Sequence, residues 1–163
     1  MKLVTKLVTG ATLSLAAIAG WTYVSNLKRS AAELQIIPKA SLYKLGWDGL
    51  VIRVDVLLKN PAKGSFVMQF PFVTVLYKNT VVGSSQASSK EVKVPATSEI
   101  KLDPVYIQIP VSNVFSVVFS LVKSLFNKEA ITMLIRTQTQ IKLGLISIPY
   151  ENKTEVNLQK TSA

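Results

Sequence analysis

Residues 50–70 read LVIRVDVLLKNPAKGSFVMQF. Over residues 50–58 every second side chain is apolar, which is the pattern of a half-buried strand in an antiparallel sheet. The strand is expected to end at Asn60-Pro61, because proline has no N–H group to donate to a sheet. A second run begins at Phe66. The stretch therefore predicts two strands and a turn in which the Asn60 side chain binds backbone groups.

Alternation of this kind recurs along the chain. It predicts antiparallel strands at residues 50–59, 66–77, 99–109 and 131–142. A run that starts at Leu34 is interrupted by Pro38, and Pro71 indicates a bulge or an edge position. Lys78-Asn79-Thr80 predicts a hairpin turn. Short strands of this spacing are typical of a β-sandwich. The expected core residues are Val54, Val56, Phe66, Phe70, Ile107, Ile109, Phe119 and Ile135.

Residues 113–127 change to a helical period. Serine, lysine and asparagine recur there at helical spacing from Ser116 to Asn127, and nearly all the remaining residues are apolar. A helix this apolar is expected to cover an open end or side of the sandwich. The other interpretation is a helix that binds lipid or a partner protein.

The amino-terminal segment, residues 1–30, is predicted to form a hydrophobic helix ahead of a domain over residues 31–163. Residues 7–27 carry no charge and are long enough to span a bilayer. Trp21 and Tyr23 suit a membrane interface, and Lys28 and Arg29 follow the apolar run. These features favour a membrane anchor, with the side of the membrane left open.

Two alternatives to the anchor remain. Ala17-Ile18-Ala19 resembles a signal-peptide cleavage site, which would give a secreted or periplasmic protein. The small residues of the segment also suit a helix buried against other subunits, which would give a particle-associated protein.

The composition limits the chemistry. The 163 residues include no cysteine and no histidine, so thiol nucleophiles, histidine bases and most zinc or copper sites are not expected. No phosphate-binding or nucleophile-elbow motif occurs, and no catalytic residue, metal, cofactor or small-molecule substrate is predicted. The net charge of +10 favours anionic partners. A specific nucleic-acid partner is not expected, since the aromatic residues of a nucleic-acid groove are not evident.

The order of motifs resembles the late embryogenesis abundant (LEA) type 2 family, which includes the water-stress-and-hypersensitive-response domains. A strand ends at Asn60-Pro61, a strand like IKLDPVYIQIPV and a helix like SNVFSVVFSLVKSLF follow, and the end is built around Pro149-Tyr150. The resemblance covers about residues 33–158. It implies a seven-stranded antiparallel sandwich of immunoglobulin or fibronectin III type with one helix. Plant members are often acidic, whereas this chain is basic.

The resemblance also implies a non-enzymatic role in desiccation or stress protection, and membrane-tethered members carry a transmembrane helix before the domain. We therefore expect a tethered binding or protective module. The alternative is a structural subunit of a virion or envelope complex. Partner proteins would then bind at the strand edges or at the helix over residues 113–127.

Overall fold

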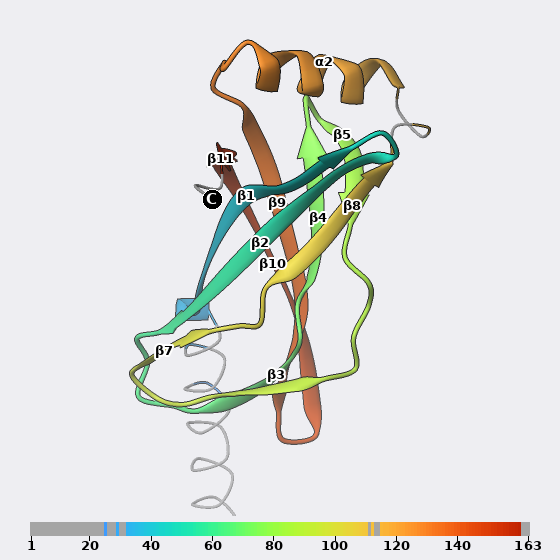
Figure 1. Cartoon of the computed structure of the whole chain (residues 1–163). Coiled ribbons are helices and arrows are strands. Elements are labelled where there is room, and N and C mark those ends of the chain that lie inside the picture. Colours follow the sequence, from blue (N-terminus) through green and yellow to red (C-terminus); the bar gives the residue numbers. More distant parts are fainter. Residues whose placement is uncertain (1–24, 26–28, 30–31, 111, 113–114, 161–163) are drawn as a thin grey trace, which may run out of the picture.

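The computed structural model describes residues 25, 29, 32–110, 112 and 115–160 (Figure 1). Within this part of the chain, eleven strands form two sheets, and helix α2 (Phe115–Phe126) follows β8 in the sequence. The strands are β1 (Gln35–Gly46), β2 (Gly49–Asn60), β3 (Phe66–Gln69), β4 (Phe72–Tyr77), β5 (Thr80–Ser84), β6 (Glu91–Val94), β7 (Ser98–Lys101), β8 (Val105–Pro110), β9 (Thr132–Leu143), β10 (Ile146–Asn157) and β11 (Gln159–Lys160).

Each sheet is built around one long strand. In the first sheet, β2 pairs with β1 along one side and with β7 and β8 along the other, and β11 adds a short parallel pairing to β1. In the second sheet, β9 pairs with β10 along one side and with β3 and β4 along the other. β6 then pairs with β3, and β5 pairs with β4. The prediction of a mainly β fold with antiparallel sheets and a late helix is confirmed.

Prolines divide strands that the sequence pattern predicts as continuous. The strand expected at residues 66–77 is split into β3 and β4 at Pro71, and the strand expected at 99–109 is split into β7 and β8 before Val105. Pro38 does not interrupt β1, contrary to expectation. On its far side β1 pairs with β11 only at Ser41 and Leu42, so the missing N–H of Pro38 costs no sheet hydrogen bond there.

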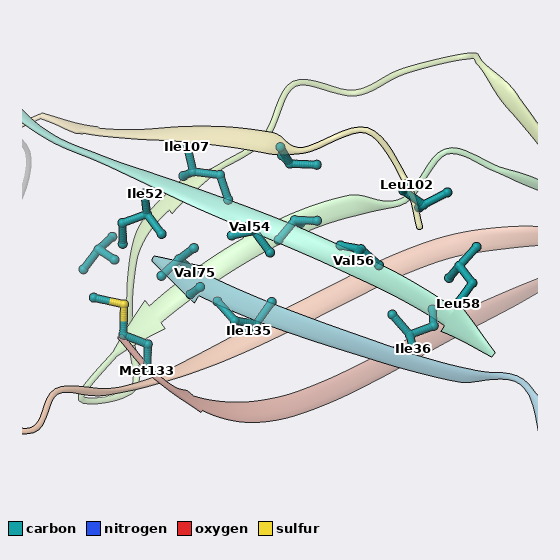
Figure 2. Packing of buried hydrophobic residues seen from close by; sticks show 14 of the residues in the cluster. Ile36, Ile52, Val54, Val56, Leu58, Val75, Leu102, Ile107, Met133 and Ile135 are labelled. Carbon is teal, nitrogen blue, oxygen red and sulfur yellow. The ribbon is translucent and has the colours of Figure 1, made fainter. Parts of the chain in front are cut away.

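The core lies between the two sheets (Figure 2). Val54 and Val56 of β2 face Ile107, Val75 and Ile135 from other strands, and all five are fully buried. Of the expected core residues, Val54, Val56, Phe66, Ile107, Ile109 and Ile135 are confirmed. Phe70 is only half-buried, because it stands at the break between β3 and β4.

Phe119 was expected in the core, and this prediction is wrong. The side chain is 61% exposed, whereas Leu121, two residues later on α2, is fully buried. The helix is apolar almost all round, so its sequence alone does not fix which side faces the sandwich. Its predicted span is confirmed over Phe115–Phe126, and residues 113 and 114 lie outside the described part.

Side chains and a glycine close the two open sides of the sandwich. On one side the Tyr150 hydroxyl donates to the Leu34 carbonyl at 2.7 Å, and the Asn152 amide donates to the Ile36 carbonyl at 2.7 Å. On the other side Gly83 of β5 lies against β8, where an added Cβ would stand 2.9 Å from Ile107 Cγ2. The two sheets are therefore held together along both edges.

Candidate interaction surfaces

Asn60 lies buried at the end of β2, and its side chain organises the turn that follows. The Asn60 amide donates to the Gly64 carbonyl at 2.9 Å and to the Pro95 carbonyl at 2.7 Å. The Asn60 side-chain oxygen accepts from the Ala62 N–H at 3.1 Å. Pro61 is exposed beside it. These bonds join the turn after β2 to the loop between β6 and β7.

Of the residues expected at a membrane interface, the structure describes only Arg29. It is helical and exposed. Trp21, Tyr23 and Lys28 lie outside the described residues, as do most of residues 7–27. Of the helices that the structure describes, none has the length and hydropathy needed to cross a membrane.

Exposed apolar side chains gather at the end of the sandwich covered by α2. Figure 1 shows α2 lying across this end, close to the β1–β2 turn and to the connection between β4 and β5. Trp47 in the β1–β2 turn is fully exposed, and Phe126 on α2 is 74% exposed. We call this the α2-end surface; its apolar members are Leu45, Trp47, Val81, Phe119 and Phe126.

The β1–β2 turn that presents Trp47 has a fixed shape. Gly49 closes it with a φ of 141°, a conformation that side-chain-bearing residues rarely adopt. A Cβ at Gly49 would stand 2.1 Å from the Ile109 carbonyl oxygen. The turn is therefore packed against the end of β8, and Trp47 projects from a rigid part of the fold.

A groove crosses the α2-end surface between α2 and β1. Its volume is about 460 Å³. Apolar side chains from both elements, from the residue before β9 and from the residue after β10 form most of its lining: Leu42, Leu45, Leu125, Phe126, Ile131 and Leu158. Lys128 and Glu129 stand at its polar side. The groove thus joins Leu45 and Phe126, which are far apart in the sequence, in one apolar depression.

Four lysines lie on the elements that form this end of the sandwich. Exposed Lys44 lies on β1, Lys78 in the β4–β5 turn, and Lys123 and Lys128 at the carboxyl end of α2. Against these four cations stand the two carboxylates Asp48 and Glu129. The α2-end surface therefore carries a net positive charge.

Glu129 is tied to its surroundings. Its carboxylate accepts from the Ser124 hydroxyl at 2.8 Å and from the Asn127 amide at 3.2 Å. These hydrogen bonds, with a smaller contribution from Lys123 and Lys78, hold the pKa of Glu129 below its ordinary value. The charges of Lys78 and Lys123 thus act on one carboxylate, which places the β4–β5 turn near the end of α2.

Apolar side chains are also exposed at the other end of the sandwich. Leu145 is fully exposed and Ile146 is exposed beside it in the β9–β10 turn, which Figure 1 shows far from α2. Gly144 in the same turn has a φ of 65° and no atom near the position of a Cβ. A side chain at Gly144 would therefore stand in open space.

The outer faces of the two sheets are mainly polar and internally paired. On the first sheet, Arg53 donates to Asp55 at 2.8 Å, so the two side chains form an ion pair. On the second sheet, a shallow depression of about 560 Å³ includes Gln69 and Gln138. Their amides donate to the Ser88 carbonyl and to the Glu151 carboxylate, at 3.1 Å and 2.8 Å. Polar groups of this depression therefore bind one another.

Within the described part of the chain, no three acidic residues come together in an arrangement that could hold a metal ion. Several carboxylates there pair instead with cations on the surface, as in the pairs Lys59–Glu99 and Lys90–Asp103, at 2.9 Å and 2.6 Å. Pairs this exposed contribute little to stability.

Among solved structures, a similar fold occurs in the crystal structure of a protein from Archaeoglobus fulgidus. The alignment covers 80% of this chain and 99% of that chain, with a TM-score of 0.51 and 15% sequence identity. The solution structure of AT1g01470 from Arabidopsis thaliana aligns over 77% of this chain and 80% of that chain, with a TM-score of 0.47 and 18% identity. No protein-family model and no curated protein matches the sequence. The comparisons show a similarity of fold.

Proposed function

We propose that the chain is a non-catalytic binding and protective module of the LEA type 2 kind, tethered to a membrane by residues 7–27. The sequence motifs support this proposal by their order. Asn60-Pro61 stands at the end of β2, α2 follows β8, and Pro149-Tyr150 lies in β10. The similarity to the Archaeoglobus fulgidus structure supports the fold and carries no argument about activity.

The strand positions also suit the seven-stranded sandwich of that family. β7 and β8 occupy one position beside β2, β3 and β4 occupy one position beside β9, and β6 and β5 extend that sheet in the same way. With β1, β2, β9 and β10 these make seven positions, to which β11 adds a short strand. We propose that they correspond to the immunoglobulin-like or fibronectin III-like arrangement.

The observation that carries the binding function is the α2-end surface. Its large apolar side chains are exposed although the fold has a separate, well-buried core. The groove that joins Leu45 and Phe126 has Lys128 and Glu129 in its lining, and exposed apolar side chains beside charged ones are typical of a surface that another molecule covers. Binding through such a surface needs no catalytic group.

The tether is tested on the full chain by cell fractionation and by the intact mass of the native protein. We expect the intact mass of a chain that begins at Met1. We also expect the protein to stay with membranes after alkaline extraction. The double substitution Leu15→Arg and Ile18→Arg should release it, because each arginine at the centre of a membrane helix costs about 2.5–3.5 kcal/mol. A matched control, Leu145→Arg and Ile146→Arg, changes the distant β9–β10 turn and should leave fractionation unchanged.

A native protein that begins at Gly20 would contradict the tether and favour a secreted form. The protective role is tested separately, by drying dye-loaded vesicles that carry the reconstituted chain. We expect less dye leakage on rehydration than from vesicles carrying an unrelated single-helix membrane protein at the same density. Equal leakage would contradict protection and leave the tether standing.

The alternative function is a structural subunit of a larger assembly. The exposed Leu145 and Ile146 favour it, since they give the molecule a second apolar site at the end opposite α2. Two different sites at opposite ends suit a head-to-tail contact between copies. Light scattering of the full chain in detergent distinguishes the two functions, because a subunit should form oligomers that Leu145→Ser and Ile146→Ser disrupt, whereas a tethered module should be monomeric.

A further inference from the structure

The composition of the α2-end surface favours a lipid headgroup region over a protein partner. Trp47 and Phe126 are exposed at this end of the sandwich, where β1, the β4–β5 turn and the end of α2 also carry the exposed lysines Lys44, Lys78, Lys123 and Lys128. Tryptophan is enriched at membrane–water interfaces, where its ring spans the apolar and polar layers. Lysine is depleted in protein–protein interfaces but attracts anionic lipids. Exposed apolar side chains together with lysines at one end of the molecule are therefore complementary to an anionic bilayer surface.

The α2-end surface and the start of β1 lie at opposite ends of the sandwich. β1 begins next to Leu34 at one end and reaches the β1–β2 turn beside α2 at the other (Figure 1). Its twelve residues separate the two ends by about 40 Å, at a rise of about 3.3 Å per residue. The α2-end surface is thus far from the point where the amino-terminal segment joins the domain.

The link between that segment and the domain is short. From Leu27 to Leu34 the chain advances seven residues, which span at most about 25 Å when fully extended. If residues 7–27 cross a bilayer, this link is too short for the domain to turn over. The α2 end of the domain then cannot reach the surface of the same bilayer. A tethered molecule therefore presents this end away from its own membrane.

We propose that the α2-end surface docks onto the headgroup region of a second, anionic bilayer, so that the tethered chain bridges two membranes. The proposal rests on the tether of the proposed function. Trp47 and Phe126 enter the interfacial layer, and the lysines contact lipid phosphates and carboxylates. Glu129 stays ionised here, because Ser124 and Asn127 bind its carboxylate, but the four lysines outnumber Glu129 and Asp48 and leave a net positive charge.

The experiment uses the full chain reconstituted into heavy vesicles of phosphatidylcholine, which are neutral. Dye-labelled light vesicles that contain phosphatidylserine are then added, and the dye that sediments with the heavy vesicles is measured. We expect co-sedimentation at low salt and its loss at about 0.5 M salt, where the Debye length falls to about 4 Å. Light vesicles of phosphatidylcholine alone should stay in the supernatant.

Two matched pairs of variants locate the contact. Trp47→Ser with Phe126→Ser should lower the co-sedimenting dye about tenfold, because both side chains lose their apolar insertion. Leu145→Ser with Ile146→Ser removes similar exposed area at the other end and should have no effect. Lys44→Glu, Lys78→Glu and Lys128→Glu together should abolish docking. Lys39→Glu, Lys63→Glu and Lys93→Glu change the net charge equally away from α2 and should preserve most of it.

Failure of the chain to sediment with the heavy vesicles, measured before the light vesicles are added, would overturn the tether and this proposal together. A chain that sediments with the heavy vesicles but captures no anionic vesicles would overturn only this proposal. Equal losses in the two lysine triple variants would also overturn it, since the field of the whole molecule would then be responsible. Clustering of the heavy vesicles on their own would overturn it in favour of contact between copies of the chain.

Discussion

At the scale of single residues, the buried side-chain amide of Asn60 is the main polar group of the turn that follows β2. It makes two hydrogen bonds as a donor and one as an acceptor, all to backbone groups of nearby loops. Removing a buried group of this kind costs more stability than its hydrogen bonds contribute on folding, because its partners are left without water or protein to bind. Asn60 therefore fixes where β2 ends and where the loop before β7 lies.

Asn60→Ala should lower the free energy of unfolding by about 2–3 kcal/mol, since it leaves two carbonyls and one N–H without their partner. Urea unfolding of the full chain in a mild detergent, followed by circular dichroism, measures this. The control is Asn157→Ala, which removes one exposed side-chain hydrogen bond to Thr132 and should cost less than about 0.5 kcal/mol. Equal effects would show that the Asn60 hydrogen bonds do not hold the turn.

At the scale of elements, α2 divides its apolar side chains between the sandwich and the outside. Leu121 is fully buried, and Val122 and Leu125 pack partly against the core. Phe119 and Phe126 point outward on the same helix. One helix thus both covers the end of the core and forms part of the α2-end surface.

Leu121→Asp should prevent folding, because an unpaired charge in the core costs several kcal/mol. Phe119→Asp should leave the fold intact, since an exposed aspartate keeps its water. The far-UV circular dichroism spectrum and a cooperative thermal transition of each full-length variant decide the matter. A misfolded Phe119→Asp protein together with a folded Leu121→Asp protein would reverse the assigned orientation of α2.

At the scale of the whole molecule, the two sheets are joined along one side by hydrogen bonds from β10 to β1. The Tyr150 hydroxyl donates to the Leu34 carbonyl, and burial raises the pKa of Tyr150 above its ordinary value of 10.0. Only the protonated phenol can donate this bond. A raised pKa in the folded state means that stability is full below pH 10 and declines as the pH rises above it.

Tyr150→Phe should lower the free energy of unfolding by about 1 kcal/mol at neutral pH, the typical contribution of one hydrogen bond. Above about pH 10 the difference between wild type and variant should narrow, because the wild-type phenol then ionises on unfolding and phenylalanine does not. Urea unfolding at pH 7, 9 and 11 measures both effects. A difference that grows with pH would contradict the sign of the pKa shift.

The sequence by itself determined the elements whose pattern is local. Alternation over residues 50–58 follows from the pleat of a strand, and a proline breaks or bends a strand wherever its missing N–H would be needed. The same reasoning placed the hairpin turn, where Lys78 and Asn79 both have positive φ as a tight β-hairpin requires. It also placed most of the core, because one face of each such strand must be buried.

The tertiary structure alone decided what depends on neighbours distant in the sequence. Pro38 stays within β1 because β11 pairs with the outer side of β1 only at Ser41 and Leu42, and Phe119 faces outward because Leu121 takes the place against the core. The α2-end surface also depends on the fold, which brings Leu45 of β1 and Phe126 of α2 into the lining of one groove. No periodicity connects these two residues, since only the packing of the two sheets and α2 sets the distance between them.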